Sequence, residues 1–190
     1  MMLKVVTING SPQEKSKTGV LLSHISKSIN RRIEAQITDI NLSDPQRPIT
    51  SYLMRDHIPQ DLEKTLQEIE SANLMVIGTP VYRGSYSGIL KHLFDLVDRD
   101  AMRSKIALLA ATGGSSLHGL VIDHQLRPLM AFFGVHSVPT SLYAVPEDFE
   151  ELKLKSSSLV TRIERATEEA CSLVAAGFIT REKLLRHESI

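Results

Sequence analysis

Short apolar runs and amphipathic segments alternate along most of the chain. The short runs are rich in β-branched residues and predict strands, whereas segments whose apolar residues recur every three or four positions predict helices. The five predicted strands are Leu3–Asn9, Glu34–Leu42, Leu74–Ile77, Ser104–Thr112 and Val135–Val145. The five predicted helices are Thr18–Ile33, Asp61–Ala72, Ser87–Val97, Leu117–Phe133 and Ser156–Ala176, with Thr18 as the cap of the first. This alternation is typical of an α/β fold with a parallel sheet.

The order of these elements also predicts how the sheet is wound. Strand–helix–strand units join parallel strands by right-handed crossovers, which place helices on both faces of the sheet. We therefore expect a doubly wound, five-stranded parallel sheet of order 2-1-3-4-5, and a single domain over residues 1–190. In such a sheet the winding direction changes between the first and third strands, and ligands bind beyond the carboxyl ends of the strands at this point.

Four features depart from the alternation. Gly78, Thr79 and Pro80 are expected to end the third strand, and Ser43–Pro59 contains three prolines and no sustained period, which predicts a long loop on the functional side with one short turn. Pro139 predicts that the fifth strand lies at a sheet edge or carries a bulge, because proline cannot donate a ladder hydrogen bond. The acidic stretch Glu147–Glu151 is interpreted as a solvated approach to the last helix.

Composition restricts the classes of binding partner and the cellular compartment that we expect. Lys and Arg together number 22, as do Asp and Glu, so the formal net charge is zero. This removes the main electrostatic basis for binding nucleic acid or an anionic membrane surface. No apolar run approaches the roughly 18 residues that cross a bilayer, and the N-terminus is predicted as a strand rather than a signal peptide. With a single cysteine, Cys171, we expect a soluble, cytoplasmic protein.

The loop after the first predicted strand has the chemistry of a phosphate site. It runs from Gly10 to Thr18 into a helix, and the hydroxyls of Ser11, Ser16 and Thr18 would add to the free N–H groups of the helix start. The loop has neither the G-x-G-x-x-G nor the G-x-x-x-x-G-K-[ST] pattern, which disfavours a dinucleotide-binding dehydrogenase and a P-loop NTPase. The alternative is a capped helix after a polar turn.

Two further loops follow the third and fourth predicted strands. Thr79–Gly88 offers aromatic rings and hydroxyls, and Ala111–Ser116 contains the paired glycines Gly113 and Gly114, which let a ring edge approach backbone N–H groups closely. Phosphate on the first loop and a planar heterocycle across the other two describe bound FMN. The alternative is that both loops are ordinary strand-to-helix turns.

These motifs resemble the NADPH-dependent FMN reductase family. The resemblance is carried by Gly10-Ser11-Pro12 with Ser16 and Thr18, by Thr79–Lys91 and by Ala111–Gly114, and it spans Leu3–Leu142. It is greatest to the alkanesulfonate-linked flavin reductases of two-component monooxygenase systems. Val81 and the pair Tyr86-Ser87 differ from the Glu and Ile-Pro that are usual in the azoreductase and quinone reductase branch. The resemblance implies a flavodoxin-like fold.

The resemblance also implies which residues hold the flavin. Ser11, Ser16 and Thr18 would bind the FMN phosphate, with Lys17 compensating for Gln13, where many relatives carry Arg. The full predicted set is Ser11, Ser16, Lys17, Thr18, Pro80, Val81, Tyr82, Arg83, Ser85, Tyr86, Thr112, Gly113, Gly114 and Ser115. A phosphate site with one charge fewer suits an enzyme that treats FMN as a substrate and releases it.

Pro128 interrupts the predicted helix Leu117–Phe133. It lacks the N–H for an i→i−4 hydrogen bond, and its ring would clash with the carbonyl of His124. The apolar positions also change phase here, which predicts a kink or a one-residue π-bulge near His124. The resemblance implies a π-helix at a subunit interface, with His124 where a Tyr is common. The alternative is a plain proline kink with a solvent-facing His124.

The predicted function is NAD(P)H-dependent reduction of FMN, with hydride passing from nicotinamide C4 to flavin N5, and with no side chain named as catalytic. The resemblance implies that reduced FMN is supplied to a partner monooxygenase for organosulfur compounds, and that the protein forms homodimers or homotetramers. The seven histidines show no ligand spacing and no CxxC is present, so no metal site is expected. The alternatives are an FMN-retaining quinone or azo reductase, a flavodoxin-type electron carrier and a flavin-free regulatory domain.

Overall fold

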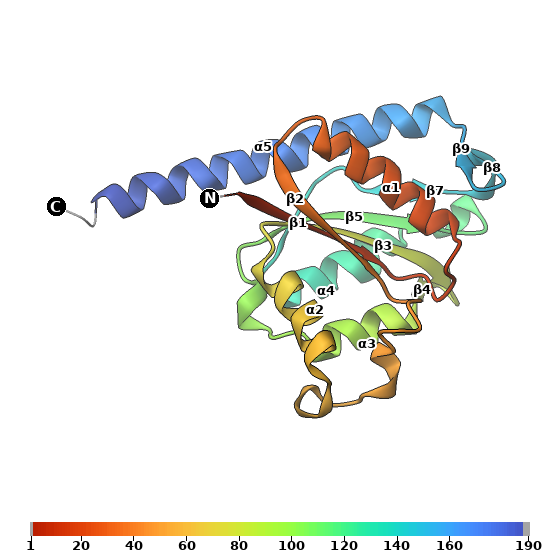
Figure 1. Cartoon of the computed structure of the whole chain (residues 1–190). Coiled ribbons are helices and arrows are strands. Elements are labelled where there is room, and N and C mark those ends of the chain that lie inside the picture. The colour runs from red at the N-terminus through yellow and green to blue at the C-terminus, as the bar shows by residue number, and fades with distance from the viewer. Residues whose placement is uncertain (1, 188–190) are drawn as a thin grey trace.

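The computed structural model, which describes residues 2–187, has a twisted parallel sheet at its centre (Figure 1). Its strands are β1 (Leu3–Asn9), β2 (Ala35–Asn41), β3 (Leu74–Tyr82), β5 (Ile106–Thr112), β6 (His136–Ser137) and β7 (Leu142–Ala144). The order is β2-β1-β3-β5, with β6 and β7 both paired to the outer side of β5, and every one of these pairs is parallel. The predicted 2-1-3-4-5 order and flavodoxin-like winding are therefore confirmed.

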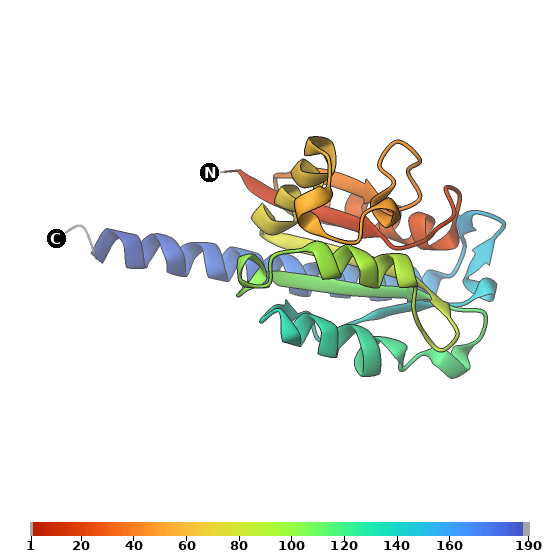
Figure 2. The same cartoon turned by 90° about the horizontal axis from the view of Figure 1, so that it is seen from below.

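Helices cover both faces of this sheet (Figures 1 and 2). The helices are α1 (Lys17–Asn30), α2 (Gln60–Ser71), α3 (Gly88–Leu96), α4 (Arg127–Phe132) and α5 (Ser157–His187). One buried apolar cluster joins α1 and α5 to the sheet, and the other joins α2, α3 and α4 to the opposite face. Leu74, Met75, Val76 and Ile77 of β3 lie fully buried between the two clusters. Each such side chain contributes about 1.5–3 kcal/mol by leaving water, which makes β3 the centre of the fold.

Helix α1 begins two residues earlier than a cap at Thr18 would place it. Ser16 is the N-cap, because it has extended backbone dihedrals and its Oγ accepts a hydrogen bond from Gly19 N at 3.1 Å. The prediction that Thr18 caps this helix is wrong, since Thr18 lies in the first turn and is buried. Ser and Thr are both good N-caps, so the residue type alone does not distinguish the two positions.

Strand β3 continues through the residues that were expected to end it. Gly78, Thr79 and Pro80 pair with Ala110, Ala111 and Thr112 of β5, so the expected break at this point is wrong. The chain then turns back as β4 (Ser85–Tyr86), which pairs antiparallel with the end of β3. The two turn residues, Arg83 and Gly84, have φ values of 51° and 78°. Positive φ at both positions is what a tight two-residue hairpin requires, and glycine favours it.

The predicted fifth strand is interrupted between β6 and β7. Side chains replace the missing ladder bonds: Arg127 donates to the carbonyls of Val138 and Pro139 at 2.9 and 2.7 Å, and Arg162 donates to the carbonyl of Ser141 at 2.9 Å. Thr140 donates to Glu169 from both its N–H, at 3.0 Å, and its hydroxyl, at 2.7 Å. The prediction of an edge position at Pro139 is confirmed, and the prediction of one continuous strand is wrong.

A π-helix over Ile122–Leu126 precedes α4 directly. The N–H of Arg127 donates to the carbonyl of Ile122, five residues earlier, which widens the turn immediately before Pro128. Pro128 occupies the first turn of α4, where a missing N–H is tolerated. The π-bulge predicted near His124 is therefore present. The amino-terminal part of the predicted helix is instead a short 3-10 turn, Ser116–His118.

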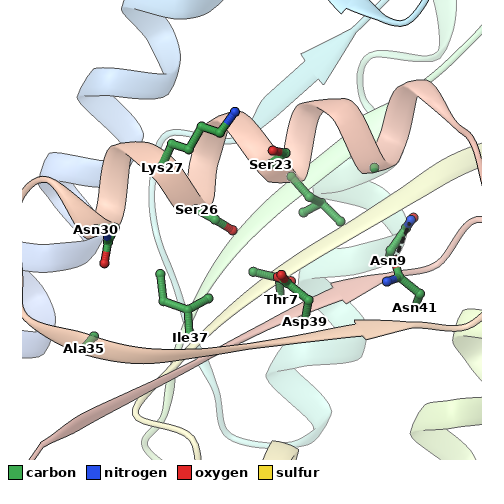
Figure 3. Close-up of a pocket in the computed structure, with 12 residues that line it drawn as sticks. Thr7, Asn9, Ser23, Ser26, Lys27, Asn30, Ala35, Ile37, Asp39 and Asn41 are labelled. Atoms are coloured by element: carbon green, nitrogen blue, oxygen red, sulfur yellow. Dashed lines mark hydrogen bonds between the residues drawn. The ribbon is translucent and has the colours of Figure 1, made fainter.

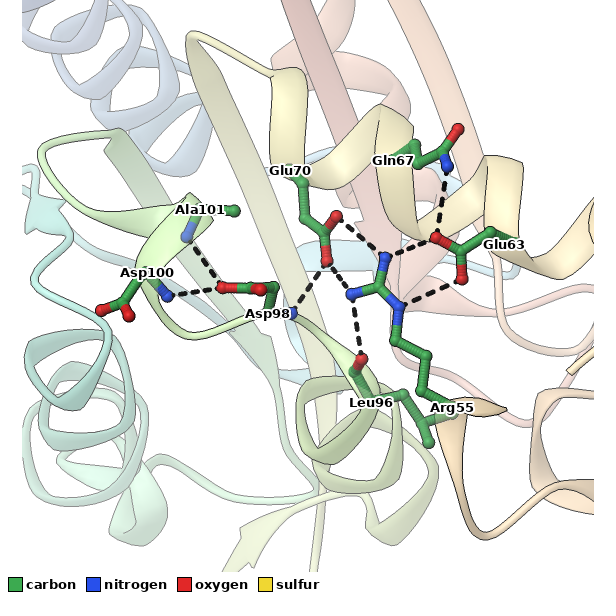
Figure 4. A network of polar contacts seen from close by, with 8 residues as sticks. All are labelled: Arg55, Glu63, Gln67, Glu70, Leu96, Asp98, Asp100 and Ala101. Atoms are coloured by element: carbon green, nitrogen blue, oxygen red, sulfur yellow. Dashed lines mark hydrogen bonds and ion pairs between the residues drawn. The ribbon is translucent and has the colours of Figure 1, made fainter. Parts of the chain in front are cut away.

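The long loop between β2 and α2 contains two 3-10 turns, Ile49–Ser51 and Arg55–His57, rather than one. Ile49 is buried in the core, and Nε2 of His92 lies 3.1 Å from the carbonyl oxygen of Ile49 and 2.8 Å from that of Tyr52. Arg55 forms ion pairs with Glu63 and Glu70 of α2 (Figure 4). The loop is thus fixed to α2 and α3 at both of its turns.

The segment before α5 forms a small antiparallel hairpin, β8 (Phe149–Glu150) and β9 (Lys153–Leu154). Phe149 is buried, and the Nζ atom of Lys17 lies 5.7 Å from the centre of its ring, so the hairpin rests beside the start of α1. The interpretation of this acidic stretch as a solvated approach to α5 missed the hairpin. No helix within residues 2–187 is long and apolar enough to cross a membrane.

Candidate flavin site

The loops after β1 and β3 are joined by short backbone contacts. Gly10 N donates to the carbonyl of Gly78 at 2.7 Å, and the Ser87 hydroxyl donates to the carbonyl of Gly10 at 2.5 Å. A Cβ atom on Gly10 would lie 2.9 Å from the oxygen of Gly78. Glycine is therefore required here for contact between the two strand ends, and the loops are held at fixed positions relative to each other.

The first loop has free donors at the start of α1. Ser11 N donates to Oδ1 of Asn9 and Gln13 N donates to Oγ of Ser11, both at 3.1 Å, which folds the loop into a turn. The N–H groups of Glu14 and Ser16 have no acceptor within residues 2–187. With the hydroxyl of Ser16 still able to donate, this arrangement suits an anion such as a phosphate group.

The first and third loops meet through two threonines. The hydroxyl oxygens of Thr18 and Thr112 lie 2.7 Å apart, and both residues are buried. Both residues belong to the predicted flavin-binding set, and the structure brings their side chains together. Their hydrogen bond joins the start of α1 to the end of β5, so the phosphate loop and the glycine loop share one support.

Tyr143 of β7 supports the third loop from behind. Its hydroxyl donates to the carbonyl of Ser115 at 2.7 Å, and burial raises its pKa, which keeps the hydroxyl protonated as a donor. A Cβ atom on Gly113 would lie 1.9 Å from the Tyr143 hydroxyl oxygen, whereas one on Gly114 would meet no atom within 4 Å. The N–H groups of Gly114 and Ser115 donate to no acceptor in the described chain. They can meet carbonyl oxygens at the edge of a ring.

The β3–β4 hairpin carries the predicted aromatic residues. Tyr82 is 44% exposed at the end of β3, Arg83 is exposed in the turn, and Val81 and Tyr86 are half-buried opposite each other. Ser85 Oγ lies 3.4 Å from Oε1 of Gln125, which connects the hairpin to the π-helix. The hairpin thus presents a tyrosine ring and a guanidinium group to solvent next to the other two loops.

Lys17 is placed differently from the other predicted phosphate residues. Its ammonium group lies over Phe149 of the β8–β9 hairpin, a contact that favours a cation over a ring face. Supporting residues outside the predicted flavin-binding set are Asn9, Thr79, Ser87 and Tyr143. Thr79 accepts a hydrogen bond from Ser87 N at 3.0 Å. The roles of these residues depend on contacts between distant segments, for which a single sequence has no local signal.

The described residues contain no group of three His, Cys, Asp or Glu side chains placed to hold a metal ion.

Residues 3–150 match the family described as NADPH-dependent FMN reductase. The chain is 43% identical over 171 residues to the NADH-dependent FMN reductase SfnF of Pseudomonas fluorescens (strain Pf0-1), covering 90% of this chain and 91% of the relative. It is 42% identical over 183 residues to an FMN reductase (NADPH) of Pseudomonas aeruginosa, covering 96% of each chain. Crystal structures of apo NADH:FMN oxidoreductase (EmoB) superpose with a TM-score of 0.79 at 28% identity, covering 92% of this chain and 90% of that one.

Proposed function

The chain belongs to the NADPH-dependent FMN reductase family, and on this basis we propose that it reduces FMN with NAD(P)H and supplies the reduced flavin to a monooxygenase of organosulfur metabolism. The single observation that carries the proposal is the meeting of three loops at the carboxyl ends of β1, β3 and β5. They combine a phosphate-binding helix start, an aromatic hairpin and a glycine loop with free N–H groups. The named activity of the relatives and this arrangement point to the same chemistry.

The residues present fit FMN. The Ser11 and Ser16 hydroxyls and the N–H groups at the start of α1 would hold the phosphate, as the free donors there allow. Pro80, Val81 and Tyr82 would line the ring system from the β3 side. The free N–H groups of Gly114 and Ser115 would bond the carbonyl oxygens at its pyrimidine edge.

The bound flavin supplies the redox chemistry by accepting a hydride from the nicotinamide ring. The protein residues bind and orient the two nucleotides, and no side chain needs to act as an acid or a base. The exposed ring of Tyr82 and the guanidinium of Arg83 lie on the open side of the hairpin, where a second planar nucleotide would stack. The nicotinamide donor and the single buried Cys171 support a cytoplasmic location.

Steady-state oxidation of NADH and NADPH at varied free FMN tests the proposal. Nicotinamide consumption that saturates with added FMN, from a protein purified without bound flavin, is the expected result. A protein that retains its flavin, and whose turnover is independent of added FMN but fast with quinones or azo dyes, would instead be an FMN-retaining quinone or azo reductase. Absence of both nicotinamide oxidation and flavin binding would remove the enzyme assignment.

The Ser11→Ala variant tests the phosphate site within that assay. We expect the KM for FMN to rise about tenfold, the equivalent of one lost charge-assisted hydrogen bond. The KM for riboflavin, which has no phosphate, should stay unchanged, and this makes riboflavin the internal control. An equal rise for both flavins would place Ser11 outside the phosphate site.

We also propose that the π-helix and its flanks form a subunit interface. Leu117, Leu120 and Phe132 are 88%, 65% and 63% exposed, a concentration of exposed apolar side chains on one segment. A hollow of about 290 Å³ between this segment and Gly84 of the β3–β4 hairpin includes His124. A second copy placed here would therefore contact the hairpin that borders the flavin ring.

A further inference from the structure

Two pairs of polar side chains connect β1 to the outer strand β2 beneath α1 (Figure 3). The Thr7 hydroxyl donates to the carboxylate of Asp39, and Nδ2 of Asn9 donates to Oδ1 of Asn41 at 3.2 Å. All four residues line a groove of about 530 Å³ between α1 and β2. Asp39 and Asn41 are exposed, whereas Thr7 and Asn9 are buried. Each pair therefore joins an exposed residue of β2 to a buried residue of β1.

The Asn9 amide also reaches the phosphate loop. Its Oδ1 accepts a hydrogen bond from Ser11 N at 3.1 Å, while its Nδ2 donates to Asn41. A backbone N–H can only donate, so the oxygen of the Asn9 amide has to face Ser11 and its nitrogen has to face Asn41. The two hydrogen bonds therefore use both ends of one buried side chain and fix its orientation.

The first turn of α1 packs against the same amide. A Cβ atom on Gly19 would lie 3.1 Å from Nδ2 of Asn9 and 3.4 Å from Oγ of Ser16, so a side chain at this position would press on the amide. The backbone of Asn9 is held as well, because Leu42 N donates to its carbonyl at 3.1 Å. Asn9 is thus fixed by β2 on one side and by the start of α1 on the other.

The position of Asn9 affects what the Ser11 hydroxyl can do. Ser11 Oγ accepts a hydrogen bond from Gln13 N at 3.1 Å, which leaves the hydroxyl proton available to donate. In the proposed function this proton is donated to the FMN phosphate. Its direction depends on where the backbone of Ser11 lies, and hydrogen bonds weaken steeply when their angle is distorted. The bond from Ser11 N to Asn9 therefore influences how well the loop binds phosphate.

We propose that Asn9 and Asn41 are positioning residues for the FMN phosphate, and that Asn41 acts through Asn9. The inference rests on the FMN reductase function proposed above, and it makes phosphate recognition dependent on the outer strand β2. Asn41 holds the amide of Asn9, and Asn9 holds the backbone of Ser11, so neither asparagine needs to touch the flavin. Riboflavin has no phosphate, and its binding should not depend on this series of contacts.

Equilibrium titration of FMN and riboflavin with the full-length protein, followed by flavin fluorescence, tests the proposal. Asn41→Ala removes the outer acceptor at an exposed position, so this variant should fold normally. We expect its Kd for FMN to rise about threefold, as for the indirect loss of one neutral hydrogen bond, and its Kd for riboflavin to stay unchanged. Asn9→Ala leaves Ser11 N without its acceptor and should raise the Kd for FMN about tenfold.

A double variant tests whether Asn41 acts through Asn9. Asn9→Ala/Asn41→Ala should bind FMN as weakly as Asn9→Ala alone, because the group that Asn41 holds is then already absent. A further rise of about threefold in the double variant would show that Asn41 acts independently, and it would overturn the proposed series of contacts.

Asp39→Ala is the matched control. Asp39 is exposed on the same strand and accepts from Thr7 of β1, but within residues 2–187 neither side chain bonds to the phosphate loop. Removing a negative charge favours phosphate, so the Kd for FMN should stay unchanged or fall slightly.

Three results would overturn the proposal. They are an unchanged Kd for FMN in Asn41→Ala, an equal rise for FMN and riboflavin in that variant, and equal weakening of FMN binding by Asp39→Ala and Asn41→Ala. The last two would indicate a general effect on the sheet. Failure of the wild type to bind either flavin would instead count against the proposed function.

Discussion

At the scale of single residues, the hydrogen bond between Thr18 and Thr112 is the contact on which the first and third loops depend. Replacing Thr18 by Val keeps the shape and leaves the Thr112 hydroxyl buried without a partner. We expect Thr18→Val to lower the free energy of unfolding by about 1–3 kcal/mol. The double variant Thr18→Val/Thr112→Val should lose less than the sum of the single variants, because it leaves no unpaired hydroxyl. Urea unfolding without added flavin measures this, and strict additivity would contradict the pairing.

Gly113 and Gly114 have different spatial requirements although they are adjacent. A Cβ on Gly113 would collide with Tyr143, so Gly113→Ala should destabilise the protein by about 1–3 kcal/mol and weaken FMN binding. Gly114→Ala, which meets no neighbouring atom, is the matched control and should leave the free energy of unfolding within about 0.5 kcal/mol of the wild type. In a Tyr143→Ala background the cost of Gly113→Ala should largely disappear. A similar cost in both backgrounds would exclude the collision as its cause.

The sequence predicts the chemical role of a residue where the residue type alone determines that role. The paired glycines and the hydroxyls at the strand ends were predicted from residue type, because glycine allows close backbone approach to a ligand and Ser and Thr carry hydroxyls that can bond a phosphate. The partners of those residues were not predictable, since the contact of Thr18 with Thr112 and that of Tyr143 with Ser115 join distant positions. Thr18 rather than Ser16 was chosen as the cap of α1 for a different reason: the capping contact is local, from Gly19 N to Ser16 Oγ, but Ser and Thr are both good N-caps.

At the scale of elements, Arg55 attaches the long β2–α2 loop to helix α2 (Figure 4). Its guanidinium contacts both Glu63 and Glu70, and Glu70 also accepts from Asp98 N at 2.8 Å. Arg55→Met should lower the free energy of unfolding at pH 7 by about 1.5–3 kcal/mol, the value of hydrogen bonds to charged groups. Lys91→Ala, which breaks the exposed pair with Asp95, is the control and should cost less than about 1 kcal/mol.

The stabilisation by Arg55 should depend on pH. Hydrogen bonding to Arg55 holds the pKa of Glu63 below its ordinary value of 4.5. A carboxylate with a depressed pKa stabilises the fold fully above its unfolded pKa, and that contribution is lost as the pH falls through the lower folded value. The difference in unfolding free energy between wild type and Arg55→Met should therefore be constant above about pH 5.5 and shrink below pH 4.5. A difference that stays constant down to pH 3 would show that the pair contributes no charge-dependent stability.

Element type was predictable wherever a periodic pattern ran long enough. The central helices and buried strands follow from that periodicity, and the π-helix follows from Pro128 together with the change of phase around it. Errors occurred where tertiary contacts override local signals. Pro80 lies inside β3 because Thr112 of β5 pairs with it and β4 pairs with the two residues that follow it. The β8–β9 hairpin forms where Phe149 is buried.

At the scale of the whole molecule, the proposed interface makes a prediction about assembly. Leu120→Glu places a charge on the exposed flank of the π-helix and should shift the protein toward monomers, as measured by sedimentation velocity. Leu53→Glu is the matched control, because Leu53 is 80% exposed but lies in the β2–α2 loop. Equal sedimentation of wild type and Leu120→Glu, both as oligomers, would place the interface elsewhere.

The interrupted outer strand also determines whether a segment of another chain, unfolded or partly folded, can add to the edge of the sheet. A free strand edge is a template on which a foreign segment can add, which is the first step toward fibrils. Between β6 and β7, however, Arg127, Arg162 and Glu169 already bond to the backbone of Val138–Ser141. An incoming chain meets no continuous row of donors and acceptors there. In the parallel sheet, the edge that can accept a foreign strand is therefore the opposite one, along β2.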